Sequence, residues 1–155
     1  MIRGNVAELK LGQLAAERAQ SQQVREYGDM LKKDHTQSLE KASSLASEIG
    51  VPASSELSAQ QQKQFESLQK LSGEEFDTTF LSQMVRDHQS EIAKFSAQAQ
   101  SGSDPEVMAF AKETLPTLQA HLQHAQSIQS DLTSASRSSG SRPVSPSGPA
   151  PSSER

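Results

Sequence analysis

The chain has 155 residues, enough for one domain with a buried core, and its net charge is −4. An acidic chain of this kind offers no basic surface for DNA, RNA or an anionic membrane, so we expect no nucleic-acid binding. The chain has no cysteine, which excludes disulfides, thiolate metal sites and cysteine nucleophiles, and no apolar run long enough for membrane insertion.

Residues of high helix propensity dominate most of the chain, chiefly alanine, glutamine, glutamate, lysine and leucine. Two long helices are predicted first, over about residues 3–20 and 22–49, because apolar residues recur there at three- and four-residue steps. In the first helix Gly12 follows Glu8 by one turn, and so small a residue leaves room for a side chain from across the bundle.

The next two helices are predicted to begin at capping boxes, in which a serine and a residue three positions later satisfy each other's backbone amides. Ser58 with Gln61 opens a short helix that ends near residue 71. Ser72 with Glu75 then opens a long helix that reaches about residue 100.

The last helix is predicted to begin after Asp104 and Pro105, an N-cap followed by a first-turn proline, and to end near residue 132. Pro116 lies inside this helix and should kink it unless a neighbouring group takes up the freed carbonyl. Residues 134–155 are rich in serine, proline, glycine and arginine, with almost nothing apolar, so we expect a disordered tail there.

These segments predict an all-α fold for residues 1–133: an antiparallel bundle of four long helices with an extra short helix between the two helix pairs. An internal echo supports two related pairs. A basic residue, an aspartate and a histidine occur together at 33–35 and again at 86–88.

Three of the four histidines lie on the apolar faces of three different predicted helices. His35, His88 and His121 each have apolar neighbours at helical spacing, whereas His124 lies toward the flank of its face. Imidazole is a common ligand of zinc, iron and manganese, and helical bundles commonly hold such metals between facing helices. The three histidines are therefore the first candidate ligands of a metal site.

Carboxylates accompany the histidines on the same faces. Glu91 lies one turn after His88, and Glu8 lies among small and apolar residues of the first helix. The inward-facing positions hold almost no lysine or arginine, and an unpaired buried charge is costly, so a divalent cation is the natural counter-charge. Glu8 and Glu91 are therefore further candidate ligands.

Two aspartates directly precede two of the candidate histidines. Asp34 and Asp87 lie about 100° round their helices from His35 and His88, at the edge of the apolar face. That position suits a carboxylate that orients an imidazole from behind. Copper is a weaker candidate, because Met84, the one thioether near a histidine, is better explained as core filling.

A second interpretation of the same residues stays open. The inward histidines would then be hydrogen-bonded core residues that fix helix register in a non-catalytic envelope or stress-related interaction module. The sequence contains no serine–histidine–acid context and no glycine-rich phosphate loop, so it identifies no reaction and leaves open whether the protein is an enzyme.

Four motifs resemble those of a known family and follow one another along the chain in the family's order. They are Ala7-Glu8-Leu9-Lys10-Leu11-Gly12-Gln13-Leu14-Ala15, Asp34-His35, Met84-Val85-Arg86-Asp87-His88 and Leu115-Pro116-Thr117-Leu118-Gln119-Ala120-His121-Leu122. The chain resembles the bacterial ferritin-like family of unknown function DUF4142 over about residues 5–132. The resemblance implies a ferritin-like four-helix bundle with an extra short helix, and a metal site at Glu8, His35, His88 and His121.

The resemblance also carries expectations about location and about the kind of centre. Members of the family are often exported, so a periplasmic or otherwise exported protein is expected, with the cytoplasm as the alternative. Di-iron ferritins carry Glu-x-x-His on each of two helices, whereas this chain has only His88-x-x-Glu91, in reversed order. A mononuclear, histidine-rich site is therefore expected in place of a ferroxidase centre.

Overall fold

The structure is a computed structural model that describes residues 1–139, and its elements are all helical over that range. In chain order the helices are α1 (Ile2–Arg18), α2 (Gln22–Glu48), α3 (Ala59–Gln69), α4 (Gly73–Ser101) and α5 (Pro105–Ser139). The all-α prediction is confirmed. None of the described helices is both long enough and apolar enough to cross a membrane.

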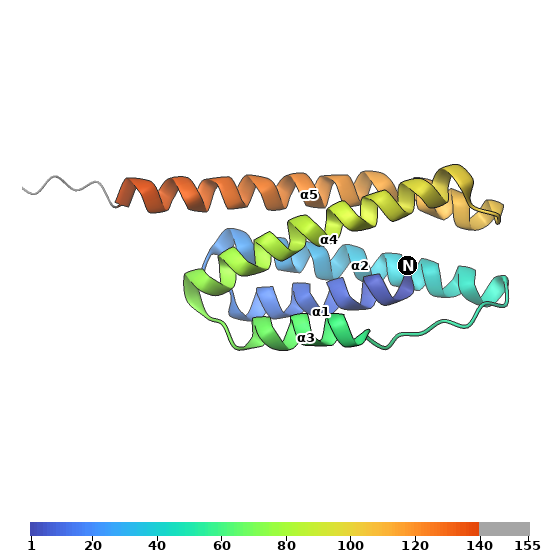
Figure 1. The fold of residues 1–155 in the computed structure, drawn as a ribbon, viewed down its shortest axis with the longest axis horizontal. Helices are drawn as coiled ribbons and strands as arrows, with labels where there is room; N and C mark the ends of the chain where they lie inside the picture. The colour runs from blue at the N-terminus through green and yellow to red at the C-terminus, as the bar shows by residue number, and fades with distance from the viewer. Residues whose placement is uncertain (140–155) are drawn as a thin grey trace, which may run out of the picture.

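The four long helices form two antiparallel pairs (Figure 1). α1 packs along α2, and α4 packs along α5, while α2 and α5 make the main contact between the pairs. The short helix α3 lies beside α1 and also touches α4. The predicted order of two helix pairs with a short helix between them is therefore present.

The caps agree with the sequence at two helix starts and differ at a third. Ser58 and Gln61 form the predicted capping box of α3, and Asp104 accepts backbone hydrogen bonds at the start of α5. At α4 the predicted box is absent, because the Ser72 side chain makes no capping hydrogen bond. The next residue, Gly73, has a φ of +61°, a left-handed conformation that suits glycine and turns the chain at this point.

Helix α5 extends beyond its predicted end and continues to Ser139. The hydroxyls of Thr133 and Ser134 donate to the carbonyls of Gln129 and Ser130, one turn earlier. These bonds satisfy the two hydroxyls inside the helix, where they do not interrupt the backbone hydrogen bonds of α5. The helix is also continuous through Pro116. The rest of the predicted tail, residues 140–155, lies outside the described residues.

Two glycines bring the backbones of α1 and α2 into direct contact. A Cβ added at Gly12 would lie 2.7 Å from the Gly28 carbonyl oxygen, and one added at Gly28 would lie 2.6 Å from the Gly12 carbonyl oxygen. The expectation that Gly12 leaves room for a side chain is therefore wrong. The space is taken by the backbone of α2, and this close approach fixes how deep the side chains of α1 reach into the bundle.

Candidate metal centre

A polar layer divides the apolar core into two clusters. One cluster contains Tyr27, Leu31, Phe80 and Met84, and the other contains Phe95, Phe110 and Leu118. The buried polar residues between them along the helices are Asn5 and Glu8 on α1, His35 on α2, His88 on α4 and His121 on α5. The apolar clusters therefore exclude water above and below a layer that contains the predicted histidines.

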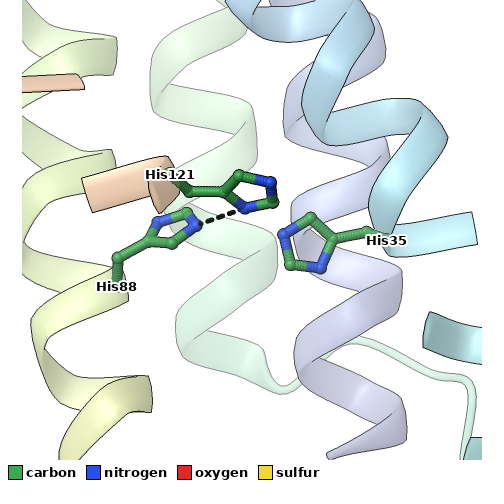
Figure 2. A group of neighbouring side chains, drawn as sticks. All are labelled: His35, His88 and His121. Atoms are coloured by element: carbon green, nitrogen blue, oxygen red, sulfur yellow. Dashed lines mark hydrogen bonds between the residues drawn. The ribbon is translucent and has the colours of Figure 1, made fainter. Parts of the chain in front are cut away.

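The three histidines meet at one point in this layer. The ring centroids lie 5.9 Å apart for His35 and His88, and 5.3 Å apart for each of the other two pairs. One ring nitrogen from each residue lies within 4.8 Å of the others, and all three rings are at most 3% exposed. Figure 2 shows the rings of His35, His88 and His121 facing one another. The structure thus brings together the histidines of three separate helices.

Each imidazole also has an oxygen acceptor at one of its two nitrogens. His35 Nδ1 lies 2.9 Å from Asn5 Oδ1, and His88 Nδ1 lies 3.0 Å from its own helix's Met84 carbonyl oxygen. His121 Nε2 lies 2.9 Å from Asp34 Oδ2. Because an amide oxygen, a carbonyl oxygen and a carboxylate only accept, each of these ring nitrogens carries the proton and donates.

These donors determine where the lone pairs of the neutral rings lie. His35 keeps its lone pair on Nε2, His88 on Nε2 and His121 on Nδ1. His35 Nε2 is buried and has no hydrogen-bond partner. A buried acceptor without a partner costs about 1–3 kcal/mol, so the fold leaves this nitrogen in a state that a ligand would relieve.

The contact between His88 and His121 also lacks a proton donor when both rings are neutral. His88 Nε2 and His121 Nδ1 lie 3.3 Å apart, the hydrogen bond dashed in Figure 2. Both nitrogens are lone-pair positions in the neutral rings, so this bond forms only when one ring takes an additional proton. A proton or a metal ion between these two nitrogens would relieve the repulsion of their lone pairs.

Burial favours the neutral, metal-binding form of all three rings. Burial, and then the neighbouring His121 and His88, lower the pKa of His35 to about 3. Burial and then the neighbouring His121 lower the pKa of His88 to about 4. The pKa of His121 is also lowered by burial, against the opposing effect of Asp34. At neutral pH the rings therefore present lone pairs.

The candidate carboxylates lie apart from the histidine nitrogens. Neither Glu8 nor Glu91 belongs to the group of ligand atoms within 4.8 Å, although Glu8 is in the same buried layer. The two aspartates that precede histidines, Asp34 and Asp87, lie in different surroundings. Asp34 lies behind His121, whereas Asp87 lines a cavity between α1, α3 and α4.

Sequence reasoning missed two partners of the rings. Asn5 was not singled out, although it lies one turn before Glu8 on the same helical face. The Asn5 amide nitrogen donates to the Met1 carbonyl oxygen at 3.4 Å, which turns Oδ1 toward His35. The Met84 carbonyl oxygen gave no sequence signal, because a backbone acceptor is independent of side-chain identity.

Comparison with known proteins agrees with the fold and names no activity. A family model described as "Domain of unknown function (DUF4142)" matches residues 1–128. A solved structure described as "Crystal structure of DUF305 fragment from Deinococcus radiodurans" matches with a TM-score of 0.74 and 19% identity, covering 84% of this chain and 91% of that chain. At that identity the likeness shows a shared fold alone. Among curated proteins, none matches this chain.

Proposed function

This chain belongs to the DUF4142 family, a domain of unknown function, and we propose from the geometry of its buried layer that it binds a divalent metal ion through His35, His88 and His121. One observation carries the proposal. Each ring donates its proton to an acceptor behind it, and the three remaining lone pairs lie within one small, dry volume. Metal-bound histidines commonly have such outer partners, which fix the tautomer of the ligand.

Zinc, iron and manganese are the metals we propose, because neutral imidazole is a ligand for each of them. Copper is less favoured, since the fully buried Met84 is part of the apolar core cluster. When bound, the metal would supply a positive charge that Asp34 offsets through His121. A ligand role for Glu8 or Glu91 stays a prediction that needs their side chains to move toward the rings on binding.

Two finer proposals rest on the sequence resemblance. We propose that the helix pairs are those of a ferritin-like four-helix bundle with an added short helix, which the arrangement of α1, α2, α4 and α5 supports. We also propose an exported, periplasmic protein in bacteria, as expected for the family. N-terminal sequencing of the protein isolated from its native source tests the location: a leader removed during export supports it, and retention in the cytoplasm contradicts it.

The metal proposal is tested with tag-free protein loaded with Zn²⁺, Fe²⁺ or Mn²⁺, dialysed and analysed for metal. We expect one ion per chain and a melting temperature that falls on chelation. At free metal about 100-fold above Kd, stabilisation is about 2.7 kcal/mol, or roughly 5–10 °C for a chain of this size.

Histidine variants separate the proposed site from adventitious binding. His35→Gln, His88→Gln and His121→Gln should each lose the bound metal while far-ultraviolet circular dichroism stays helical. His124→Gln is the matched control, because His124 is exposed and lies edge-on to Tyr27, outside the cluster. Metal retained by all three buried-site variants would contradict the proposal.

The second candidate function is a structural or interaction module, and the 3.3 Å contact between His88 and His121 is the observation in its favour. In that case one proton shared by the two rings replaces the metal, and the layer serves only to fix helix register. Protein that stays metal-free after loading and melts identically with and without chelator would support this function over metal binding.

A further inference from the structure

A cavity of about 540 Å³ lies between α1, α3 and α4, and we propose that it binds a small organic cation with an ammonium group. The cavity is separate from the histidine centre, because none of the three histidines lines it. Glu8 and Glu91, the carboxylates that would move toward a bound metal, both line the cavity, so the metal-free chain is the form that would bind the cation.

The floor of the cavity contains a buried acid without a hydrogen-bond partner. Glu8 lines the cavity, is only 3% exposed, and its Oε2 atom has no partner. Within residues 1–139 no lysine or arginine forms an ion pair with it. A buried carboxylate without a donor is unfavourable, so this oxygen is available to a ligand that brings one.

Two further carboxylates converge on the same space from α4. Asp87 and Glu91 also line the cavity, and they act electrostatically on Glu8. Gly4 on α1 makes room for one of them, because a Cβ added there would lie 2.5 Å from Glu91 Oε1. The three acidic groups therefore face one space, where a bound ammonium group would offset the charge of those that are ionised.

The size and walls of the cavity favour an organic cation over a metal ion. The three carboxylates do not form a group of ligand atoms within 4.8 Å in the described part of the chain, and the volume far exceeds that of an ion. Apolar side chains of Leu11, Phe65 and Phe95 form part of the wall and suit a short carbon chain. Gln64 of α3 adds an amide that can accept from a second ammonium group.

Three cationic groups among the described residues line the cavity and none of them forms an ion pair with Glu8: Arg3, Lys94 and the N-terminal ammonium of Met1, which acts electrostatically on Glu91. Arg3 donates to Ser54 Oγ at 3.3 Å on the α2–α3 connection, and the side chain of Lys94 is exposed. Both residues line the cavity, so they reduce the net field of the carboxylates at the entrance without reaching hydrogen-bond distance of Glu8 Oε2. A ligand therefore gains most from Glu8 at the inner end.

The test is a calorimetric titration of the metal-free chain with 1,4-diaminobutane, using uncharged 1,4-butanediol as the ligand control. We expect one diamine per chain and no heat from the diol. Glu8→Gln keeps the shape and removes the ionisable carboxyl group, and should weaken diamine binding at least tenfold. Glu17→Gln is the matched control, because Glu17 is exposed on the same helix and outside the cavity.

Gly4→Ala provides a second variant that leaves every carboxylate in place. Its methyl group displaces the Glu91 carboxylate, so diamine binding should weaken while Zn²⁺ binding persists. His35→Gln should lose Zn²⁺ binding and keep diamine binding. The two variants therefore distinguish failure of the cavity proposal from failure of the metal proposal. No diamine binding at 10 mM, equal binding to Glu8→Gln, or a preference for Mg²⁺ at Glu8 would overturn the proposal.

Discussion

Asp34→Asn is the substitution that most directly tests how the histidine centre is held from behind. Asp34 Oδ2 accepts a hydrogen bond from His121 Nε2 at 2.9 Å, and this bond fixes the lone pair of the neutral ring on Nδ1. Asparagine keeps the size but removes the charge, and its amide NH₂ group can reverse the direction of the bond. His121 would then lose both its preferred tautomer and part of its basicity.

The expected magnitude follows from what outer partners contribute to metal sites. Loss of such a partner weakens metal binding about 10- to 100-fold, or about 1.4–2.7 kcal/mol. A charged hydrogen bond replaced by a neutral one accounts for about 1 kcal/mol of this. The assay is competition for Zn²⁺ between the protein and a chromophoric chelator of known affinity, at fixed pH and ionic strength.

The internal echo of the sequence supplies a matched control. Asp87 precedes His88 as Asp34 precedes His35, yet no hydrogen bond joins Asp87 to any of the three rings. Asp87→Asn should change zinc affinity less than threefold. Zinc affinity that is unchanged in Asp34→Asn, or lowered equally by the two substitutions, would refute this explanation of the centre.

Three further predictions concern the scaffold. Gly28→Ala should destabilise the fold by about 1–2 kcal/mol in urea unfolding, because overpacking against the Gly12 backbone outweighs the gain in helix propensity; an unchanged midpoint would contradict it. Asp77→Ala should cost about 3 kcal/mol in the same assay, because the buried Asp77 carboxylate accepts two backbone N–H bonds at the start of α2; a loss below 1 kcal/mol would show that these bonds contribute little. Burial and the facing acids raise the pKa of Glu8, so in metal-free protein the folded state keeps a proton that the unfolded state loses above about pH 4.5, and stability falls as pH rises. The free energy of unfolding of Glu8→Gln, measured in urea relative to wild type, should therefore be higher at pH 8 than at pH 5. The same difference between variant and wild type at both pH values would rule this out.

The sequence predicted the histidine cluster because helical spacing determines which side chains point inward. His35, His88 and His121 each interrupt an apolar stripe, and packing the stripes together brought them to one level. The pattern did not distinguish Asp34 from Asp87, since both precede a histidine by one residue. Their different surroundings depend on which helix lies alongside: α5 approaches Asp34, whereas Asp87 borders the cavity between α1, α3 and α4.

Other features could not be predicted, because they depend on backbone position. The short distance between Gly12 and Gly28 sets the depth of α1, and so determines that Asn5 contacts His35. The Met84 carbonyl acceptor is likewise a product of helix geometry. The cavity beside Glu8 arises from the placement of α3. Few apolar residues of α3 pack against the rest of the fold, so the periodicity of its sequence does not determine where it lies.

The most direct test of the account is ¹⁵N NMR of the histidine side chains during titration with Zn²⁺. Zinc should shift His35 Nε2, His88 Nε2 and His121 Nδ1 at one equivalent, while the three protonated ring nitrogens stay protonated and His124 is unaffected. Coordination through the other nitrogens, or fewer than three rings responding, would contradict the centre described above.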